Sequence, residues 1–519
     1  MSYRSRLKTL LVAAAIAIAA PMGAGWAQEP MSGGTLHLAA PYGAALKSLD
    51  PHVTYNSQDL VVSKAFHRAL YTWDSAKNAP ALDLAELVST SEDGKTYTYR
   101  LFDNIYFHNG RKLTSDDVIW SYTRIMDPTK GYPGSVQVST LAGAKEYADG
   151  KAKEISGLKK IDDRTFSMTF NEFVDPGMLF FEAITAILPR EEVESGNFLT
   201  HPVGLGPFSF VEHVEGSRIS GKKFDKYYKQ GKPYADAVDF TISGDYSALD
   251  MAFRAGELDA TVLSENAYVL YKADPELSKG LVEVSELFTR HMGFNTEKPP
   301  FNDVRVRQAI NYAVDRDLII KKLLKDKAYK ATGWLPATSP AFDKDRQPYA
   351  YDPAKAKALL AEAGYPDGFS ATLKLPPPPY ARLGGEIIAS ELREVGINLE
   401  IIPMEWAQWL EQVFTNKEYD LTIVSHTEPN DINIYARDDY YFSYRNPRFN
   451  EIMTELDATV EPEKRKELYG QAQRIIAEDA VNVFLFQLPK IGVWDAKLEG
   501  MWENMPIQAN DLTKVRWLD

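Results

Sequence analysis

The sequence predicts a mixed α/β protein, on two observations of periodicity and one of length. Short runs such as 97–101 and 165–170 alternate apolar and polar residues, as half-buried strands do. Longer segments repeat apolar residues every three or four positions, and Val306, Ile310 and Val314 line one helix face in this way. With 519 residues, the chain is long enough for two or three domains.

The first 27 residues (1–27) have the pattern of a secretory signal peptide. Three basic side chains precede an apolar run over 10–20, and we expect cleavage after Ala27. A membrane anchor is the alternative, but the run is too short to span a bilayer. Removal of 1–27 takes away three basic and no acidic residues, so the formal charge goes from −14 to −17. Nucleic acid and anionic membranes should repel such a chain.

The chain contains no cysteine. The periplasm permits disulfides, but a chain of about 490 residues buries enough apolar surface without them. The cysteine that carries the lipid of a lipoprotein is also absent. We therefore expect a freely soluble periplasmic protein.

Local signals predict the order of elements in the second half. Asp352 is a suitable N-cap for a helix that ends at Gly364, with Pro353 in its first turn. A β-helix-β unit follows over 370–403, in which the loop PPPPYAR leads into a helix over 382–395.

A helix over 406–416 and a strand over 419–425 come next, and the stretch HTEPNDINIYARDDYYF follows the strand. In open α/β sheets, ligands bind outside the carboxyl ends of the strands. We therefore expect the PPPPY loop and the HTEPND loop to line one crevice.

Catalytic and metal-binding motifs are missing from the sequence. The eight histidines form no ligand pair, and no nucleophile elbow, phosphate loop or dinucleotide fingerprint is present. The glycines of GLGP (204–207) indicate a tight turn before a strand. Glu428 and Asp431 could serve as a glycosidase pair, but loop carboxylates are more often solvated. We expect no catalytic residue, no metal and no cofactor.

Aromatic residues near the predicted crevice are more informative. Trp406 and Trp409 lie three residues apart and share a helix face. Core packing is the alternative, and we expect it for one of the two. Trp406, Tyr380 and Tyr435 could offer a ligand large flat contacts with a polar handle.

Six segments together resemble the extracytoplasmic solute-binding proteins of the oligopeptide and dipeptide ABC importers (family 5, cluster C). They occur in the order that is typical of the family, and the resemblance covers essentially the whole mature chain. They are SEDGKTYTYRLFDNIYFHNGRKLTSDDVIWSYTRIMDP (91–128), GLGPFSF (204–210), FRAGELDA (253–260), GFNTEKPPFNDVRVRQAINYAVDRDLI (293–319), YDPAKAKALLAEAGYPDG (351–368) and ELREVGINLEI (391–401).

The resemblance implies a two-lobed α/β periplasmic-binding-protein fold (type II), which closes on its ligand by a hinge. Lobe one would comprise 33–288 and 487–519, with an extra subdomain inserted over about 60–195. Lobe two would comprise 289–486. The closed form would dock on the permease subunits of an ABC transporter, and we expect a monomer that binds no nucleic acid.

The resemblance also directs attention to the loop after the 419–425 strand. In peptide-binding members an aspartate of this loop pairs with the amino group of the ligand, but Glu428 stands about there in this chain. Family members bind peptides, opines, sugars, nickel complexes or haem, so the ligand stays open.

The predicted binding residues have separate roles in this reading. Glu428 and Asp431 would accept hydrogen bonds from a cationic or hydroxyl-rich ligand, and Trp406, Tyr435 and Tyr380 would supply aromatic contact. Arg382 would pair with a carboxylate, and Tyr42 would contribute from the opposite lobe. Two other functions stay open: a secreted hydrolase acting on glycans or peptides, and a periplasmic chaperone that holds peptides.

Overall fold

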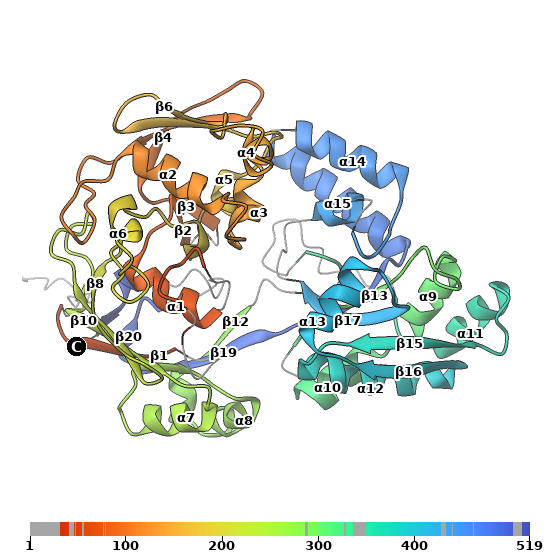
Figure 1. The fold of residues 1–519 in the computed structure, drawn as a ribbon. Coiled ribbons are helices and arrows are strands. Elements are labelled where there is room, and N and C mark those ends of the chain that lie inside the picture. Colours follow the sequence, from red (N-terminus) through yellow and green to blue (C-terminus); the bar gives the residue numbers. More distant parts are fainter. Residues whose placement is uncertain are drawn as a thin grey trace, which may run out of the picture.

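The computed structural model shows two α/β bodies that are joined by crossing strands (Figure 1). The predicted signal peptide lies outside the described residues. The structure describes residues 32–40, 46, 48–53, 57–75, 77, 79–285, 289–325, 328–335, 349–426, 432–437, 440–459, 461–501 and 511–518.

The first body is built on a seven-stranded sheet with the order β12-β19-β11-β1-β10-β9-β8. β1 runs parallel to β10 and β11, and the other pairs are antiparallel. Its strands are β1 (Thr35–Ala40), β8 (Phe208–Val214), β9 (Arg218–Lys223), β10 (Ala237–Ile242), β11 (Ala260–Val262), β12 (Leu281–Ser285) and β19 (Pro489–Trp494). Its helices are α1 (Ser57–Phe66), α7 (Tyr246–Arg254) and α8 (Glu265–Ala273).

A four-stranded antiparallel sheet with the order β4-β5-β7-β6 belongs to the same body and has its own aromatic core. The residues between α1 and β8 form this unit, so it is an insertion in the first body. The strands of the four-stranded sheet are β4 (Ala85–Thr90), β5 (Thr96–Leu101), β6 (Leu158–Lys160) and β7 (Thr165–Thr169). The unit also contains a two-stranded sheet of β2 (Tyr71–Asp74) and β3 (Ala79–Leu82). Its helices are α2 (Ser115–Ile125), α3 (Ser135–Val138), α4 (Ala144–Ala148), α5 (Pro176–Leu179) and α6 (Arg190–Glu194).

The second body contains a six-stranded sheet with the order β14-β18-β13-β17-β15-β16. The strands are β13 (Thr289–Phe294), β14 (Tyr329–Lys330), β15 (Phe369–Leu375), β16 (Ile397–Pro403), β17 (Leu421–His426) and β18 (Asn482–Gln487). The helices are α9 (Val304–Ala313), α10 (Arg316–Leu324), α11 (Pro353–Glu362), α12 (Pro379–Glu394), α13 (Trp406–Trp409), α14 (Pro447–Ala458) and α15 (Pro462–Glu478). Within the described ranges, no helix combines the length and the apolar character that a membrane span requires.

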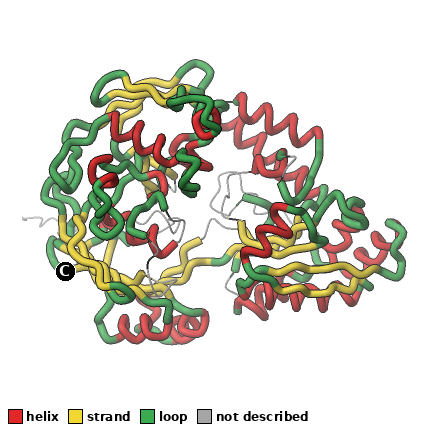
Figure 2. Tube along the Cα trace, in the orientation of Figure 1, coloured by secondary structure: helices red, strands yellow, loops and turns green. Residues whose placement is uncertain are grey.

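The chain crosses between the two bodies at two places. β12 of the first sheet is followed by β13 of the second, and β18 of the second sheet is followed by β19 of the first. Only Leu488 separates β18 from β19, so strand lies on both sides of this crossing (Figure 2). The predicted lobe boundaries fall near these crossings, and their positions stay a prediction.

Local capping predictions are confirmed by the hydrogen bonds. The Asp352 carboxylate accepts a hydrogen bond from the Lys355 amide (2.9 Å) at the start of α11, and Gly364 has a left-handed φ of 93° just after the helix. At the start of α2, Asp117 accepts hydrogen bonds from the Thr114 amide and hydroxyl, both at 2.9 Å, as in a capping box.

Two of the predicted elements differ from the observed ones. The PPPPYAR loop is shorter than predicted because α12 already begins at Pro379, where a proline at the first helical position costs no hydrogen bond. Tyr380 and Arg382 therefore lie on the first turn of a helix. The helix after β16 starts as α13 and continues as a π-helical segment (Leu410–Thr415).

Candidate functional site

The carboxyl ends of two neighbouring strands form the edge where the sequence predicts a ligand site. β15 and β17 are parallel, so both end at the same edge of the sheet. α12 starts shortly after β15, and the Tyr380 hydroxyl on its first turn accepts a hydrogen bond from the Ser425 amide of β17 (3.0 Å). The start of α12 and the end of β17 thus lie side by side.

Arg290 is a residue at this edge that the sequence reasoning missed. It lies on β13 opposite Ser425, and only 6% of its surface is exposed. Its guanidinium carbon lies 5.7 Å from the centroid of the Tyr380 ring, within the range of a cation–π contact. In the structure all six residues of β13 are buried, Arg290 included. The sequence itself shows only an arginine within this short segment.

Arg382 is half-exposed on α12 and contacts the residues after β16. Its Nη2 atom donates to the Glu405 carboxylate (3.2 Å) and to the Met404 carbonyl (3.3 Å). Because this ion pair is open to solvent, its partner can be exchanged at low cost. Arg382 is therefore available for the predicted contact with a carboxylate, which stays a prediction.

The two tryptophans after β16 have different environments. Trp409 is buried, and its Nε1 donates to the Thr422 hydroxyl of β17 (2.9 Å), so core packing holds for one of the pair as expected. Trp406 is 41% exposed and packs edge-on against Trp409, with 5.7 Å between the ring centroids. An anchored tryptophan thus positions an exposed one.

A cluster of buried rings, the aromatic cluster, lies beneath this edge. The rings of His291 and His426 stack with their centroids 4.7 Å apart. The Nε2 atom of His426 is 2.9 Å from the Tyr441 hydroxyl, and burial lowers the pKa of His291 well below its ordinary value. The cluster consists of His291, Trp334, His426, Tyr435, Tyr440, Tyr441, Phe442 and Phe484.

Tyr435 lies inside the aromatic cluster, whereas the sequence suggested an exposed wall. Only 1% of its surface is exposed, and its hydroxyl donates to the Asn482 side chain on β18 (2.5 Å). Trp334 and Phe442 each pack against its ring with centroids 5.2 Å apart. Burial among these rings explains the position, and contact with a ligand stays a prediction for Tyr435.

Three predicted binding residues, Glu428, Asp431 and Tyr42, lie outside the described residues. Their roles therefore stay predictions. In the part of the chain that the structure describes, no three histidine, aspartate or glutamate side chains gather as a metal site would require.

Known proteins resemble this chain over most of its length. The model of the bacterial extracellular solute-binding proteins, family 5 (middle), matches residues 79–452. The dipeptide-binding protein of Escherichia coli is 31% identical over 429 residues, which cover 76% of this chain and 79% of that protein. Heme-binding protein A of Haemophilus influenzae is 30% identical and covers 76% of this chain and 77% of its own.

Solved structures extend the likeness to the fold. The periplasmic binding protein DppA from Helicobacter pylori, in complex with the peptide STSA, superposes with a TM-score of 0.73. It is 23% identical, and the match covers 94% of this chain and 99% of that one. The two-lobed architecture with an inserted subdomain is therefore shared.

Proposed function

We propose that this chain, which belongs to the bacterial extracellular solute-binding proteins of family 5, captures a small peptide or peptide-like solute and delivers it to the permease of an ABC importer. The observation that carries the proposal is the site edge of the second body. Tyr380 and Arg382 follow β15 there, the exposed Trp406 follows β16, and Arg290 of the antiparallel β13 lies against Tyr380. A peptide needs both apolar and charge-bearing contacts of this kind.

The proposed mechanism is a shift between conformations. A solute that contacts both bodies binds the closed form more tightly than the open form, and the difference in affinity drives closure about the crossing strands. Tyr42 would supply a contact from the first body. The closed monomer then docks on the permease outside the cytoplasmic membrane, after export by the signal peptide.

The residues divide the recognition between them. Trp406 would cover an apolar side chain of the solute, while Arg290 and Arg382 would pair with its carboxylates. Glu428 and Asp431 would accept hydrogen bonds from an amino group. Because a glutamate reaches farther than an aspartate, Glu428 would hold the amine at a different depth than in the peptide-binding members of the family.

The two rival functions make different demands. A hydrolase needs a catalytic pair and turnover, so products should form when glycans or peptides are incubated with the protein. A chaperone that holds peptides should bind unfolded chains with little selectivity. Relatives are named for dipeptides and for heme, and we favour peptide-like solutes because the proposed edge combines aromatic and cationic side chains.

A thermal-shift panel distinguishes these functions. The panel contains di- and tripeptides, oligopeptides, opines, oligosaccharides and heme, and mass spectrometry identifies any small molecule that co-purifies. One class of peptide should raise the melting midpoint strongly, since a ligand stabilises the fold that binds it. Uniform weak shifts across the panel would contradict the proposal, and so would cleavage of any compound.

Trp406→Ala tests the site itself, with the most stabilising peptide of the panel as the probe. We expect calorimetry to show affinity that is weaker by about tenfold or more, as for an aromatic contact that covers a ligand. Phe102→Ala removes an exposed aromatic residue from the inserted unit of the first body and serves as the control. Equal affinities for the two variants would place the solute elsewhere.

A further inference from the structure

A cation–π contact between described residues joins the two bodies away from the crossing strands. The guanidinium carbon of Arg465, near the start of α15, lies 4.4 Å from the centroid of the Phe173 ring. Phe173 belongs to the segment between β7 and α5 in the first body, whereas α15 packs in the core of the second. Both side chains are half-buried.

The second body holds Arg465 in place without help from Phe173. Its Nη1 atom donates to the carbonyls of Leu456 (2.5 Å) and Thr459 (2.9 Å) at the end of α14. Its Nη2 atom lies 3.5 Å from the Tyr469 hydroxyl, one turn further along α15. The guanidinium is therefore oriented before it meets the ring, so the contact forms with little loss of side-chain entropy.

The first body holds the Phe173 segment in a similar way. The Tyr97 hydroxyl of β5 donates to the carbonyl of Val174 (2.8 Å). Asp175 accepts a hydrogen bond from the Gly177 amide (2.9 Å) and caps α5. Val174 also packs on the core of the inserted unit. Two anchored surfaces thus meet at Arg465 and Phe173.

The contact lies on the opposite side of the molecule from the strand crossing at β18–β19. In Figure 1, β19 crosses the lower half of the view, above α7 and α8, whereas α14 and α15 approach α4 and α5 near the top. A rotation of the bodies about the crossing strands moves points on the far side most. Arg465 and Phe173 are therefore placed where they oppose that motion most effectively.

We infer that Arg465 and Phe173 form a latch that restricts the motion of one body relative to the other. A single cation–π contact biases this equilibrium without locking it, so the bodies can still move when a solute binds. With the latch intact, the empty protein samples fewer relative positions of the two bodies and loses less freedom on binding. The effect on affinity rests on the proposed function, but the effect on motion rests only on the two-body fold.

Pulsed electron spin resonance tests the motion directly. The chain has no cysteine, so Glu154→Cys and Lys357→Cys place one nitroxide on an exposed site of each body. Phe173→Leu keeps an apolar side chain but removes the ring, and we expect a broader distribution of distances in the solute-free protein. Arg448→Ala removes a surface arginine of α14 that pairs with Glu451, and it should leave the distribution unchanged.

Arg465→Gln removes both the contact with Phe173 and the hydrogen bonds to the end of α14, whereas Phe173→Leu leaves those hydrogen bonds intact. Both Arg465→Gln and Phe173→Leu should broaden the distribution, and the double variant should add nothing, because the two residues act as one contact. An unchanged distribution in Phe173→Leu would overturn the inference, whatever Arg465→Gln does to the fold.

Solute affinity provides the second readout, with the peptide that the panel selects. Phe173→Leu should weaken binding by about three- to tenfold, in line with the modest strength of one cation–π contact. Tighter binding would overturn the inference, since the contact would then oppose closure. If no peptide binds even the wild type, the proposed function fails, while the distance measurement still decides the latch.

Discussion

The Arg68 network of the first body and the aromatic cluster of the second are both buried, but different forces hold them. Arg68 pairs with Asp511 (2.7 Å) and lies 3.6 Å from Asp83, which itself pairs with Lys229. The Thr513 hydroxyl accepts a further hydrogen bond from Arg68 at 2.7 Å. Charges that are hundreds of residues apart in the sequence thus fix the C-terminal segment to the first body.

In the aromatic cluster, stacked rings replace the ion pairs. Its described polar contacts join hydroxyl, amide and imidazole groups, as between Tyr435 and Asn482. A buried charge that loses its partner costs several kcal/mol, whereas a ring that loses one hydroxyl costs far less. The first region should therefore be more sensitive than the second to the loss of one partner.

Asp511→Ala should have the largest effect, because it leaves Arg68 buried without its closest carboxylate. We expect a loss of about 3 kcal/mol in the free energy of unfolding, measured by urea denaturation. Burial alone would raise the pKa of Asp511, but Arg68 and Lys229 outweigh it and lower that pKa far below the usual range. The stabilisation by Asp511 is thus complete above about pH 5 and decreases in stronger acid, so the loss caused by Asp511→Ala should be smaller at pH 3 than at pH 5.

Tyr435→Phe probes the aromatic cluster and should cost about 1 to 2 kcal/mol in unfolding free energy, since the buried Asn482 oxygen loses its donor. Urea denaturation at pH 8 provides the comparison. A loss as large as that of Asp511→Ala would erase the distinction between the two regions.

His291→Phe tests the same cluster through its pH dependence. Burial lowers the pKa of His291, so the unfolded chain takes up a proton below pH 6.5 that the folded chain does not. Stability falls as the pH falls, by about 1.4 kcal/mol per pH unit for one such histidine. The variant should lose less stability than the wild type between pH 6.5 and 5.5. Parallel curves would mean that His291 is protonated in the folded protein.

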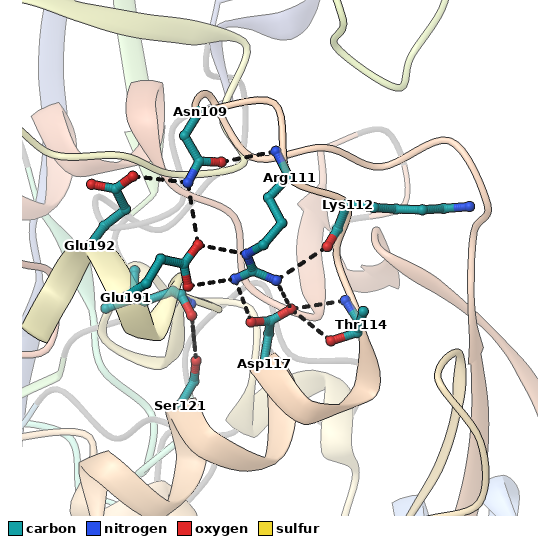
Figure 3. A network of polar contacts seen from close by, with 9 residues as sticks. Asn109, Arg111, Lys112, Thr114, Asp117, Ser121, Glu191 and Glu192 are labelled. Atoms are coloured by element: carbon teal, nitrogen blue, oxygen red, sulfur yellow. Dashed lines mark hydrogen bonds and ion pairs between the residues drawn. The ribbon is translucent and has the colours of Figure 1, made fainter.

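Glu191→Ala should have the smallest effect on the free energy of unfolding. It tests whether the cost of removing one partner of an ion pair depends on burial or on charge alone. Glu191 pairs with Arg111 (2.5 Å) in the network that Figure 3 shows, but 47% of its side chain is exposed. Arg111 also keeps its bond to Asp117. We expect a loss below about 1 kcal/mol in thermal unfolding. A loss near that of Asp511→Ala would show that charge alone sets the cost.

Features with all their partners nearby in the sequence were predictable. The cap at Asp352 depends on residues within three positions, so the local sequence is enough to predict it. The edge of the second body followed from the alternation of strands and helices, because parallel neighbours end at the same side.

The environment of each ring depended on distant residues and was not predictable. Asn482, the hydrogen-bond partner of Tyr435, comes 47 positions later in the sequence. Trp334, which packs on Tyr435, comes before it at an even greater separation. Burial of Arg290 likewise results from β17 and α12, which come much later in the sequence. A pattern within one segment cannot report such contacts.

The crossing at Leu488 has a consequence for synthesis of the protein. β18 pairs with β13 and β14 inside one sheet, and β19 pairs with β11 and β12 inside the other. A nascent chain that has not reached Trp494 thus lacks an interior strand of at least one sheet. The second body is therefore completed only with β18, and the first only after β19 and the C-terminal segment that carries Asp511.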